Sequence, residues 1–172
     1  MAYARTTYGV ILGGTLLWCA GLLLAPACTV AGGDLVPVGK ALFGFYHPIC
    51  HQMPERSIPV LGSVMGVCAR CSAIYFAFLA GVLIYPFLRR LRLLTAPSRA
   101  LLVIAALPMI VDAVWPGPVL YEVTNLSRAV TGGWFGLLLP FVILPIAIQA
   151  VHELVHGSTQ PLPLEKGRSD AQ

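Results

Sequence analysis

The sequence predicts an all-α integral membrane protein that crosses the bilayer four times and carries one short helix at the outer membrane surface. Of the 172 residues, 58% are hydrophobic and only 10% are charged, whereas soluble domains carry about 25% charged residues. The mean hydropathy is +0.82. The few charges are separated by long apolar runs, and roughly 20 apolar residues are enough to cross a bilayer.

Four apolar segments are the predicted spans: Tyr8–Ala27, Ser72–Leu88, Ala100–Trp115 and Ala129–His152. Prolines in the last two are compatible with membrane helices, because neighbouring groups satisfy the freed carbonyls. The glycines of GGWFG give the fourth segment a small-residue face that lets another helix approach closely. A cleaved signal peptide is the alternative for the first segment, but its length favours a retained helix.

Arginines set the predicted orientation. The short loop after the second span contains four of them, and such loops stay in the cytoplasm. Both termini of this cell-membrane protein are then cytoplasmic, and residues 28–71 and 116–128 lie outside. Residues 1–156 form one transmembrane domain, and the polar residues 157–172 form a disordered tail. The net charge of +4 follows from topology, so the lipid bilayer is the expected partner and nucleic acid is not.

The outer segment contains an amphipathic stretch, residues 33–46, that is too short to span and is expected to lie at the interface. Four basic residues are also placed outside, against the positive-inside trend: Lys40, Arg56, Arg70 and Arg128. Because topology does not explain these four, they indicate a functional site.

A cysteine–histidine pattern, C-H-x16-C-x2-C, is formed by Cys50, His51, Cys68 and Cys71. A C-x2-C pair commonly supplies half of a zinc site, and a third Cys with His51 would complete a Cys3His set. His47 and Asp112 are alternative fourth ligands. The pair precedes Ser72, a natural N-cap, and a helix N-terminus together with Arg70 lowers the pKa of nearby thiols.

Two other interpretations of the cysteines stay open. The outer side of a membrane is usually oxidising, so a disulfide is one of them, with Cys28 as a further partner. Packing as small hydrophobic residues is the other, and it is the favoured interpretation for Cys19. The stretch HPICH lacks the first cysteine of a c-type haem motif, which excludes covalent haem.

Charged residues of the other outer segments complete the candidate site. Asp112 lies in the third span, where a carboxylate is usually paired or functional. It either forms a salt bridge with Arg128 or acts as a metal ligand or general base. The candidate catalytic residues are therefore Asp112, Arg128 and Glu55. The candidates for binding an anion or a lipid headgroup are Arg56, Arg70 and Asn125.

The stretches CHQMPERS, CARCSAIYFAFLAG, LPMIVDA and TNLSRAVTGGWFG lie within residues 45–136. Together they resemble a family of small prokaryotic membrane proteins classed as a domain of unknown function. The resemblance implies a residue signature rather than an activity. The chain departs from it with Ser72–Ala73, where Thr-Gly is usual. The signature residues are Cys50, His51, Gln52, Pro54, Glu55, Arg56, Ser57, Cys68, Arg70, Cys71, Tyr75, Asp112, Asn125, Arg128 and Thr131.

The stretch HELVH near the end of the fourth span matches the H-E-x-x-H pattern of metalloproteases. His152 and His156 would bind zinc, with Glu153 as the base. The third zinc ligand usually lies well downstream, and only Glu165 and Asp170 are candidates in the 16 residues that follow. Gly157 ends the helix, and histidines are favourable at a helix C-terminus, so a polar helix end is the preferred interpretation.

Three functional hypotheses follow. The first is an outer metal site, with zinc as the expected ion, which is structural unless an open position lets it act on a lipid or small substrate. The second is a thiol–disulfide oxidoreductase that uses Cys68 and Cys71, with Cys50 resolving and a quinone as electron acceptor. The third is a transporter or membrane-complex subunit that uses Asp112 and Arg128.

Overall fold

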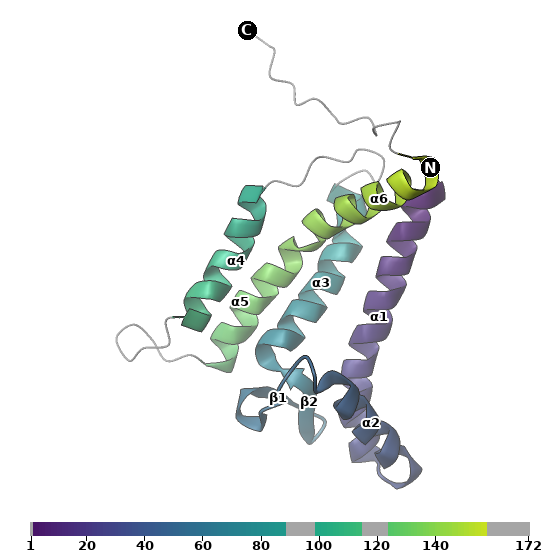
Figure 1. The fold of residues 1–172 in the computed structure, drawn as a ribbon. Coiled ribbons are helices and arrows are strands. Elements are labelled where there is room, and N and C mark those ends of the chain that lie inside the picture. Colours follow the sequence, from purple (N-terminus) through teal and green to yellow (C-terminus); the bar gives the residue numbers. More distant parts are fainter. Residues whose placement is uncertain (1, 89–98, 115–123, 158–172) are drawn as a thin grey trace.

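The computed structural model describes residues 2–88, 99–114 and 124–157, and within these ranges the chain is mainly helical (Figure 1). A long N-terminal helix and a short helix precede a β-hairpin, and four further helices follow it. A 3₁₀ turn, η1, directly precedes the short helix, and a second 3₁₀ turn, η2, directly precedes the hairpin. In chain order the elements are α1 (Ala2–Ala31), η1 (Gly33–Leu35), α2 (Val36–Tyr46), η2 (Pro54–Arg56), β1 (Ser57–Val60), β2 (Ser63–Cys68), α3 (Ala69–Leu88), α4 (Arg99–Val114), α5 (Asn125–Leu138) and α6 (Pro140–His156).

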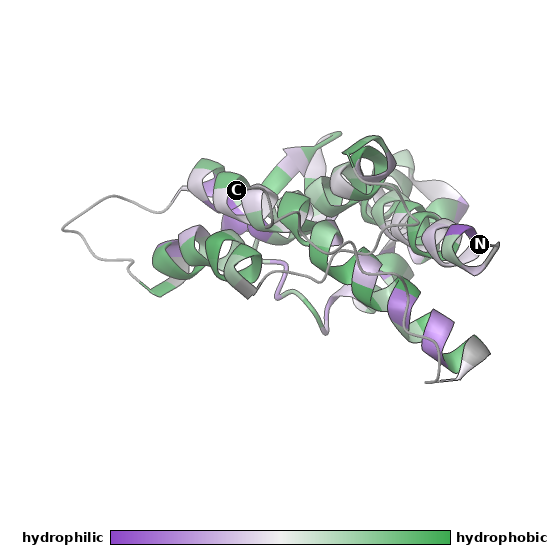
Figure 2. Cartoon of the chain, turned by 90° about the horizontal axis from the view of Figure 1, so that it is seen from above, coloured by the Kyte–Doolittle hydropathy of each residue, from purple (hydrophilic) through white to green (hydrophobic). Residues whose placement is uncertain are grey.

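Three helical stretches are long and apolar enough to cross a membrane: Tyr3–Ala31, Ala69–Leu88 and Asn125–Val155. A shorter apolar helix covers Ala100–Asp112. The hydrophobic character continues around most of the helical ribbon (Figure 2), as expected for helices that face lipid on their outer side. The predicted third span therefore corresponds to the shorter helix, α4.

The fourth predicted span starts earlier than expected and is bent. Thr124 caps α5, because its hydroxyl oxygen accepts a hydrogen bond from the Ser127 amide at 3.2 Å. The helical hydrogen bonding is interrupted at Pro140, since proline has no backbone N–H to donate, whereas the Leu139 amide still donates to the carbonyl of Phe135 at 3.1 Å. Beyond the bend, α6 reaches α1, where Ile148 packs on Ala4.

Close contact between α3 and α5 confirms the predicted small-residue face of GGWFG. Gly132 lies against the backbone of Arg70, and Gly136 lies against the backbone of Ile74. Gly133 faces a wider gap, because a side chain there would meet only the methyl group of Ala73, at 4.0 Å. The two helices can approach this closely because glycine adds no atoms between their backbones.

The β-hairpin is an element that the all-helical prediction missed. Its turn residues Leu61 and Gly62 have φ angles of 53° and 83°, and positive φ at both central positions is the geometry of a type I′ turn. The strands are too short to show clear alternation in the sequence. The hairpin is stabilised by packing against α1, where Gly66 contacts Leu22 and Ala25.

The short helix α2 confirms the helix predicted within residues 33–46. It folds back on α1, with Gly39 packed against Thr29. Figure 1 places α2 and the hairpin at one end of the helices, whereas the start of α1 and the end of α6 lie at the other end. The cysteines that follow α2 and β2 are therefore gathered at a single end of the molecule.

Candidate metal centre

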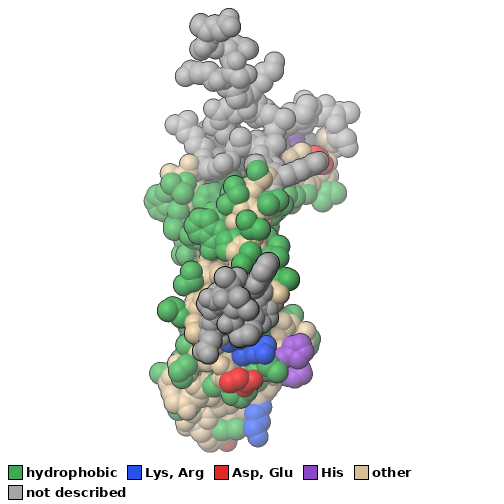
Figure 3. Space-filling model, turned by 90° about the vertical axis from the view of Figure 1, so that its left-hand side faces the viewer, with side chains coloured by type: hydrophobic (Ala, Val, Ile, Leu, Met, Phe, Trp, Pro, Cys, Tyr) green, Lys and Arg blue, Asp and Glu red, His purple; other side chains and the backbone are tan. Residues whose placement is uncertain are grey.

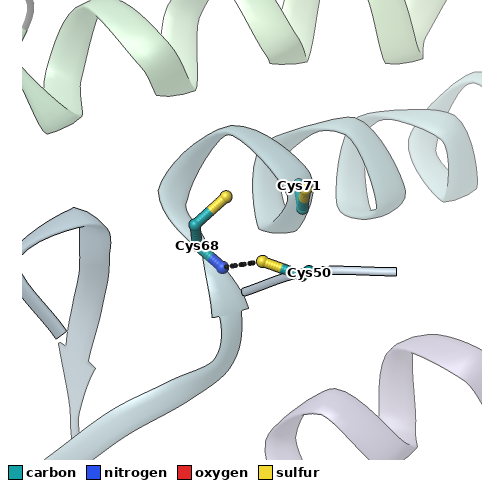
Figure 4. Close-up of side chains that lie close together, drawn as sticks. All are labelled: Cys50, Cys68 and Cys71. Carbon is teal, nitrogen blue, oxygen red and sulfur yellow. Dashed lines mark hydrogen bonds between the residues drawn. The ribbon is translucent and has the colours of Figure 1, made fainter. Parts of the chain in front are cut away.

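Three cysteines from separate segments meet beside the hairpin. Cys50 lies in the loop after α2, Cys68 ends β2, and Cys71 lies in the first turn of α3 (Figure 4). Their Sγ atoms all lie within 4.8 Å of one another. Among the described residues, this is the group of His, Cys, Asp and Glu side chains that could share a metal ion.

The chemistry of this group fits a thiophilic metal. A tetrahedral zinc ion with Zn–S bonds of about 2.3 Å separates its sulfur ligands by roughly 3.8 Å, so small side-chain rotations would bring the three atoms to that spacing. The backbone N–H of Cys68 donates a hydrogen bond to Cys50 Sγ at 3.2 Å (Figure 4). All five cysteines of the chain are free thiols in the structure, and Cys28 stands outside the cluster.

The hydrogen bond from the Cys71 side chain lowers the pKa of Cys68 to about 5, although burial acts in the opposite direction. Further hydrogen bonds from the Cys71 amide, the Cys50 side chain and the Arg70 amide act in the same direction as the first. These hydrogen bonds favour the thiolate form of Cys68, which is the form that binds metal ions and attacks disulfides.

The start of α3 differs from the prediction. The helix begins at Ala69, so Cys68 rather than Ser72 occupies the position before its first residue. The Ser72 hydroxyl donates to the carbonyl of Val67 at 3.2 Å, and it thereby ties the first turn of the helix back to the hairpin. Both thiols of the C-x2-C pair consequently lie at the positive end of the helix dipole.

Gln52 holds the loop that carries Cys50. Its side-chain amide donates to the carbonyl oxygens of Phe43 and Gly66, both at 2.8 Å, and so connects the end of α2 to β2. Its φ angle of 53° is uncommon for a residue other than glycine. The sequence identifies Gln52 only as a signature residue. Its role could not be predicted, because the sequence does not indicate which carbonyl groups its side-chain amide contacts.

A buried salt bridge anchors the C-x2-C segment. Arg70, between Cys68 and Cys71, pairs with Asp112 of α4, whose side chain is only 1% exposed. Thr131 Oγ1 lies 3.4 Å from the same carboxylate oxygen. This partner was not foreseen, since the sequence had suggested a salt bridge between Asp112 and Arg128. Asp112 is also not among the residues placed to share an ion with the cysteines.

The start of α5 contacts the same loop. Asn125 donates from Nδ2 to the carbonyl of Glu55 at 3.1 Å, and its Oδ1 accepts from Arg128 at 3.0 Å. Glu55 and Arg56 are both exposed, and within the described part of the chain no salt bridge joins them. Asn125 and Arg128 thus fasten η2 to the helix bundle.

A pocket of about 360 Å³ opens beside the thiols. It is lined by the three cysteines and by residues of the loop between Ile49 and Arg56, including His51. His51 is exposed and its ring is not within the thiol group. Figure 3 shows the side of the molecule that lies on the left in Figure 1. Most of the charged and histidine side chains visible there lie at the end that carries the hairpin.

Comparison with known proteins assigns the chain to a family. Residues 50–142 match the family described as predicted membrane protein DUF2085. An uncharacterized protein of Methanocaldococcus jannaschii, MJ1492, is 36% identical over 149 residues, which cover 85% of this chain and 96% of the relative. The chain belongs to the DUF2085 family. No solved structure matches it.

The family assignment confirms the resemblance found in the sequence. The DUF2085 match begins at Cys50 and ends at residue 142, so it contains the three cysteines, Asp112 and Arg128. HELVH lies beyond it. In this DUF2085 protein His152 is buried with its ring 5.1 Å from the Tyr3 ring, and Glu153 accepts a hydrogen bond from Gln149 at 3.0 Å.

The side chain of His156 lies outside the described residues, so the disfavoured interpretation of HELVH as a zinc-binding motif is not tested. The contact between His152 and Tyr3 docks the end of α6 on the start of α1, and the helix ends before Gly157, as predicted. The motif lies at the end of the molecule opposite the cysteines (Figure 1).

Proposed function

We propose that this DUF2085 protein holds a zinc ion at the outer surface of the membrane through the thiolates of Cys50, Cys68 and Cys71. The observation that carries the proposal is the approach of three Sγ atoms to within 4.8 Å of one another. Zinc and other thiophilic ions prefer such ligands. An ion there would join the loop after α2, the hairpin and the first turn of α3.

The proposed topology supports an outer location. With α4 as a fourth crossing, both ends of the chain lie on the cytoplasmic side, together with the arginine-rich loop between α3 and α4. The hairpin then lies on the other side, with α2 at the membrane surface. Of the four basic residues placed outside, Arg56, Arg70 and Arg128 belong to the site or its supports, whereas Lys40 does not line the pocket.

The residues around the cysteines act as supports in this proposal. Arg70 and Asp112 fix the C-x2-C segment against α4, whereas Asn125 and Arg128 hold η2 against α5. His51 lines the same pocket as the thiols, which keeps it the candidate fourth ligand from the protein. Three thiolates without an obvious water position in the sequence indicate a structural site.

Cysteine substitution tests the proposal. We expect the purified protein to contain about one zinc ion per chain, and Cys50→Ser, Cys68→Ser and Cys71→Ser each to reduce this at least tenfold, because two thiolates hold zinc far more weakly than three. Metal content is measured by mass spectrometry after dialysis against a weak chelator.

Cys28→Ser is the matched control. Cys28 is half-buried near the C-terminal end of α1, at the same end of the molecule as the three thiols, but it lies outside their group. It should retain the metal content of the native protein. Full zinc content in Cys68→Ser and Cys71→Ser would rule out the proposed site.

Thiol–disulfide exchange is a second candidate, favoured by a C-x2-C pair at a helix start with a third thiol nearby. Oxidation would join Cys68 Sγ to Cys71 Sγ and release two electrons, which reduce a quinone to a quinol together with two protons, one from the remaining thiol and one from the solvent. Mass mapping of the alkylated protein distinguishes the two functions, since this one predicts a Cys68–Cys71 disulfide and no bound metal in the protein isolated without reductant.

A further inference from the structure

We infer that the pocket beside the three thiols binds a phosphate-bearing ligand, which takes the fourth position on the metal ion and is held by Arg56. This inference rests on the proposed zinc site and names the class of ligand that the site would accept. It turns a structural metal site into a ligand-binding one.

The pocket provides the space and the open position. The three thiols lie within 4.8 Å of one another, and all three cysteines line a pocket of about 360 Å³. A tetrahedral ion that takes three ligands from one side leaves its fourth position on the other side. Because the thiols border the pocket, that fourth position opens into it.

Arg56 is the cation available to a ligand in this pocket. It lines the pocket and is exposed, and within the described part of the chain its guanidinium has no hydrogen bond or salt bridge. The neighbouring arginines are already engaged, Arg70 with Asp112 and Arg128 with Asn125. A planar guanidinium matches the geometry of phosphate oxygens and binds them through two parallel hydrogen bonds.

The backbone around Arg56 is held in place before any ligand arrives. On one side, the Ser57 hydroxyl donates to the Met53 carbonyl at 2.8 Å. On the other, Asn125 donates to the Glu55 carbonyl at 3.1 Å. Fixing the segment in advance reduces the entropy lost when a ligand binds.

Charge makes Arg56 decisive for an anion. Three thiolates and a divalent ion carry a net charge of −1, which would repel a phosphate. The guanidinium of Arg56 brings the sum to zero and places a positive charge in the same pocket as the open position. Without Arg56 the phosphate would approach a negatively charged centre. Its binding would lose the electrostatic attraction to the guanidinium and the hydrogen bonds that the guanidinium donates.

Two sources can supply this chemistry. Cys68 directly precedes the candidate span Ala69–Leu88, so the pocket lies at the end of a membrane helix, where lipid phosphates are concentrated. Free phosphate or a soluble phosphate ester is the other source. The guanidinium and the metal ion would meet the same group in both cases.

Cobalt substitution tests the inference, because the visible spectrum of Co²⁺ reports its ligands. The protein is purified in a non-ionic detergent and loaded with Co²⁺, which should give thiolate-to-cobalt absorption. It is then titrated with inorganic phosphate in one arm and with short-chain phosphatidic acid in the other. A saturable spectral shift supports the inference. A shift with phosphate indicates a soluble ligand, and a shift with the lipid alone indicates a headgroup.

Substitutions connect the shift to the pocket. Arg56→Ala should lower the affinity for the titrated ligand about tenfold or more, since hydrogen bonds to charged groups contribute about that much to binding. The affinity for cobalt should be unchanged. Arg56→Lys should restore part of the affinity. Lys40→Ala is the matched control, because Lys40 is an exposed cation of α2 that does not line the pocket, and it should bind like the native protein.

The failures are distinguishable. Cobalt bound through thiolates without a shift in either arm overturns this inference and leaves the metal site intact. The inference also fails, with the metal site intact, if Arg56→Ala binds the ligand as tightly as the native protein. Loss of cobalt in His51→Ala would show that His51 fills the fourth position, which also overturns it. Absence of thiolate-to-cobalt absorption overturns the metal site and the inference together.

Discussion

Asp112→Ala is expected to lower the free energy of unfolding by about 3 kcal/mol, because it leaves the guanidinium of Arg70 without its carboxylate in a mostly buried position. The estimate is at the low end for a broken buried pair, since the Arg70 side chain retains 23% exposure. Unfolding is measured in mixed micelles by circular dichroism as sodium dodecyl sulfate is added.

The same substitution should weaken metal binding, because Arg70 lies between two of the proposed ligands and loses its anchor on α4. Asp34→Ala provides the matched control, as Asp34 is an exposed carboxylate in η1, and we expect a change within about 0.5 kcal/mol. Equal stability of Asp112→Ala and Asp34→Ala would contradict the role assigned to the salt bridge.

Gly136→Ala should destabilise the protein by about 3 kcal/mol, through a clash that neither helix can relieve by moving a side chain. The added Cβ would lie 2.8 Å from the Cα and 2.9 Å from the carbonyl carbon of Ile74. Because these are backbone atoms, α3 and α5 must separate along their contact.

Gly133→Ala separates this clash from the general effect of alanine in a helix. It gains the same helix propensity, about 1 kcal/mol, but its Cβ meets only the Ala73 methyl at 4.0 Å. We expect Gly133→Ala to be neutral or slightly stabilising in the same unfolding assay. If both alanines had the same effect, the close approach of α3 and α5 would not be the source of stability.

The helices could be predicted because each long apolar segment carries its own signal. The predicted second and third spans agree with α3 and α4 to within about one turn. The bend before α6 is also local, since it follows from Pro140. By contrast, the hairpin depends on the packing of Gly66 and Val67 against α1, and short strands of this kind carry little periodic signal.

The three cysteines could be predicted as a group because Cys68 and Cys71 form a local C-x2-C pair and Cys50 lies only 18 residues before it in the sequence. Their supports could not. The partner of Arg70 is 42 residues away along the chain, and the sequence offered Asp112 more than one arginine. The choice is made by how α3, α4 and α5 pack together, and the close contact of α3 with α5 depends on Gly132 and Gly136.

The central claim is that three cysteine thiolates share one metal ion. X-ray absorption spectroscopy of the purified protein tests it most directly, because it counts the atoms bound to the metal. We predict three sulfur neighbours at about 2.3 Å and one lighter neighbour, oxygen or nitrogen, at about 2.0 Å. A protein with no bound metal, or a metal ion with no sulfur neighbours, would contradict the account.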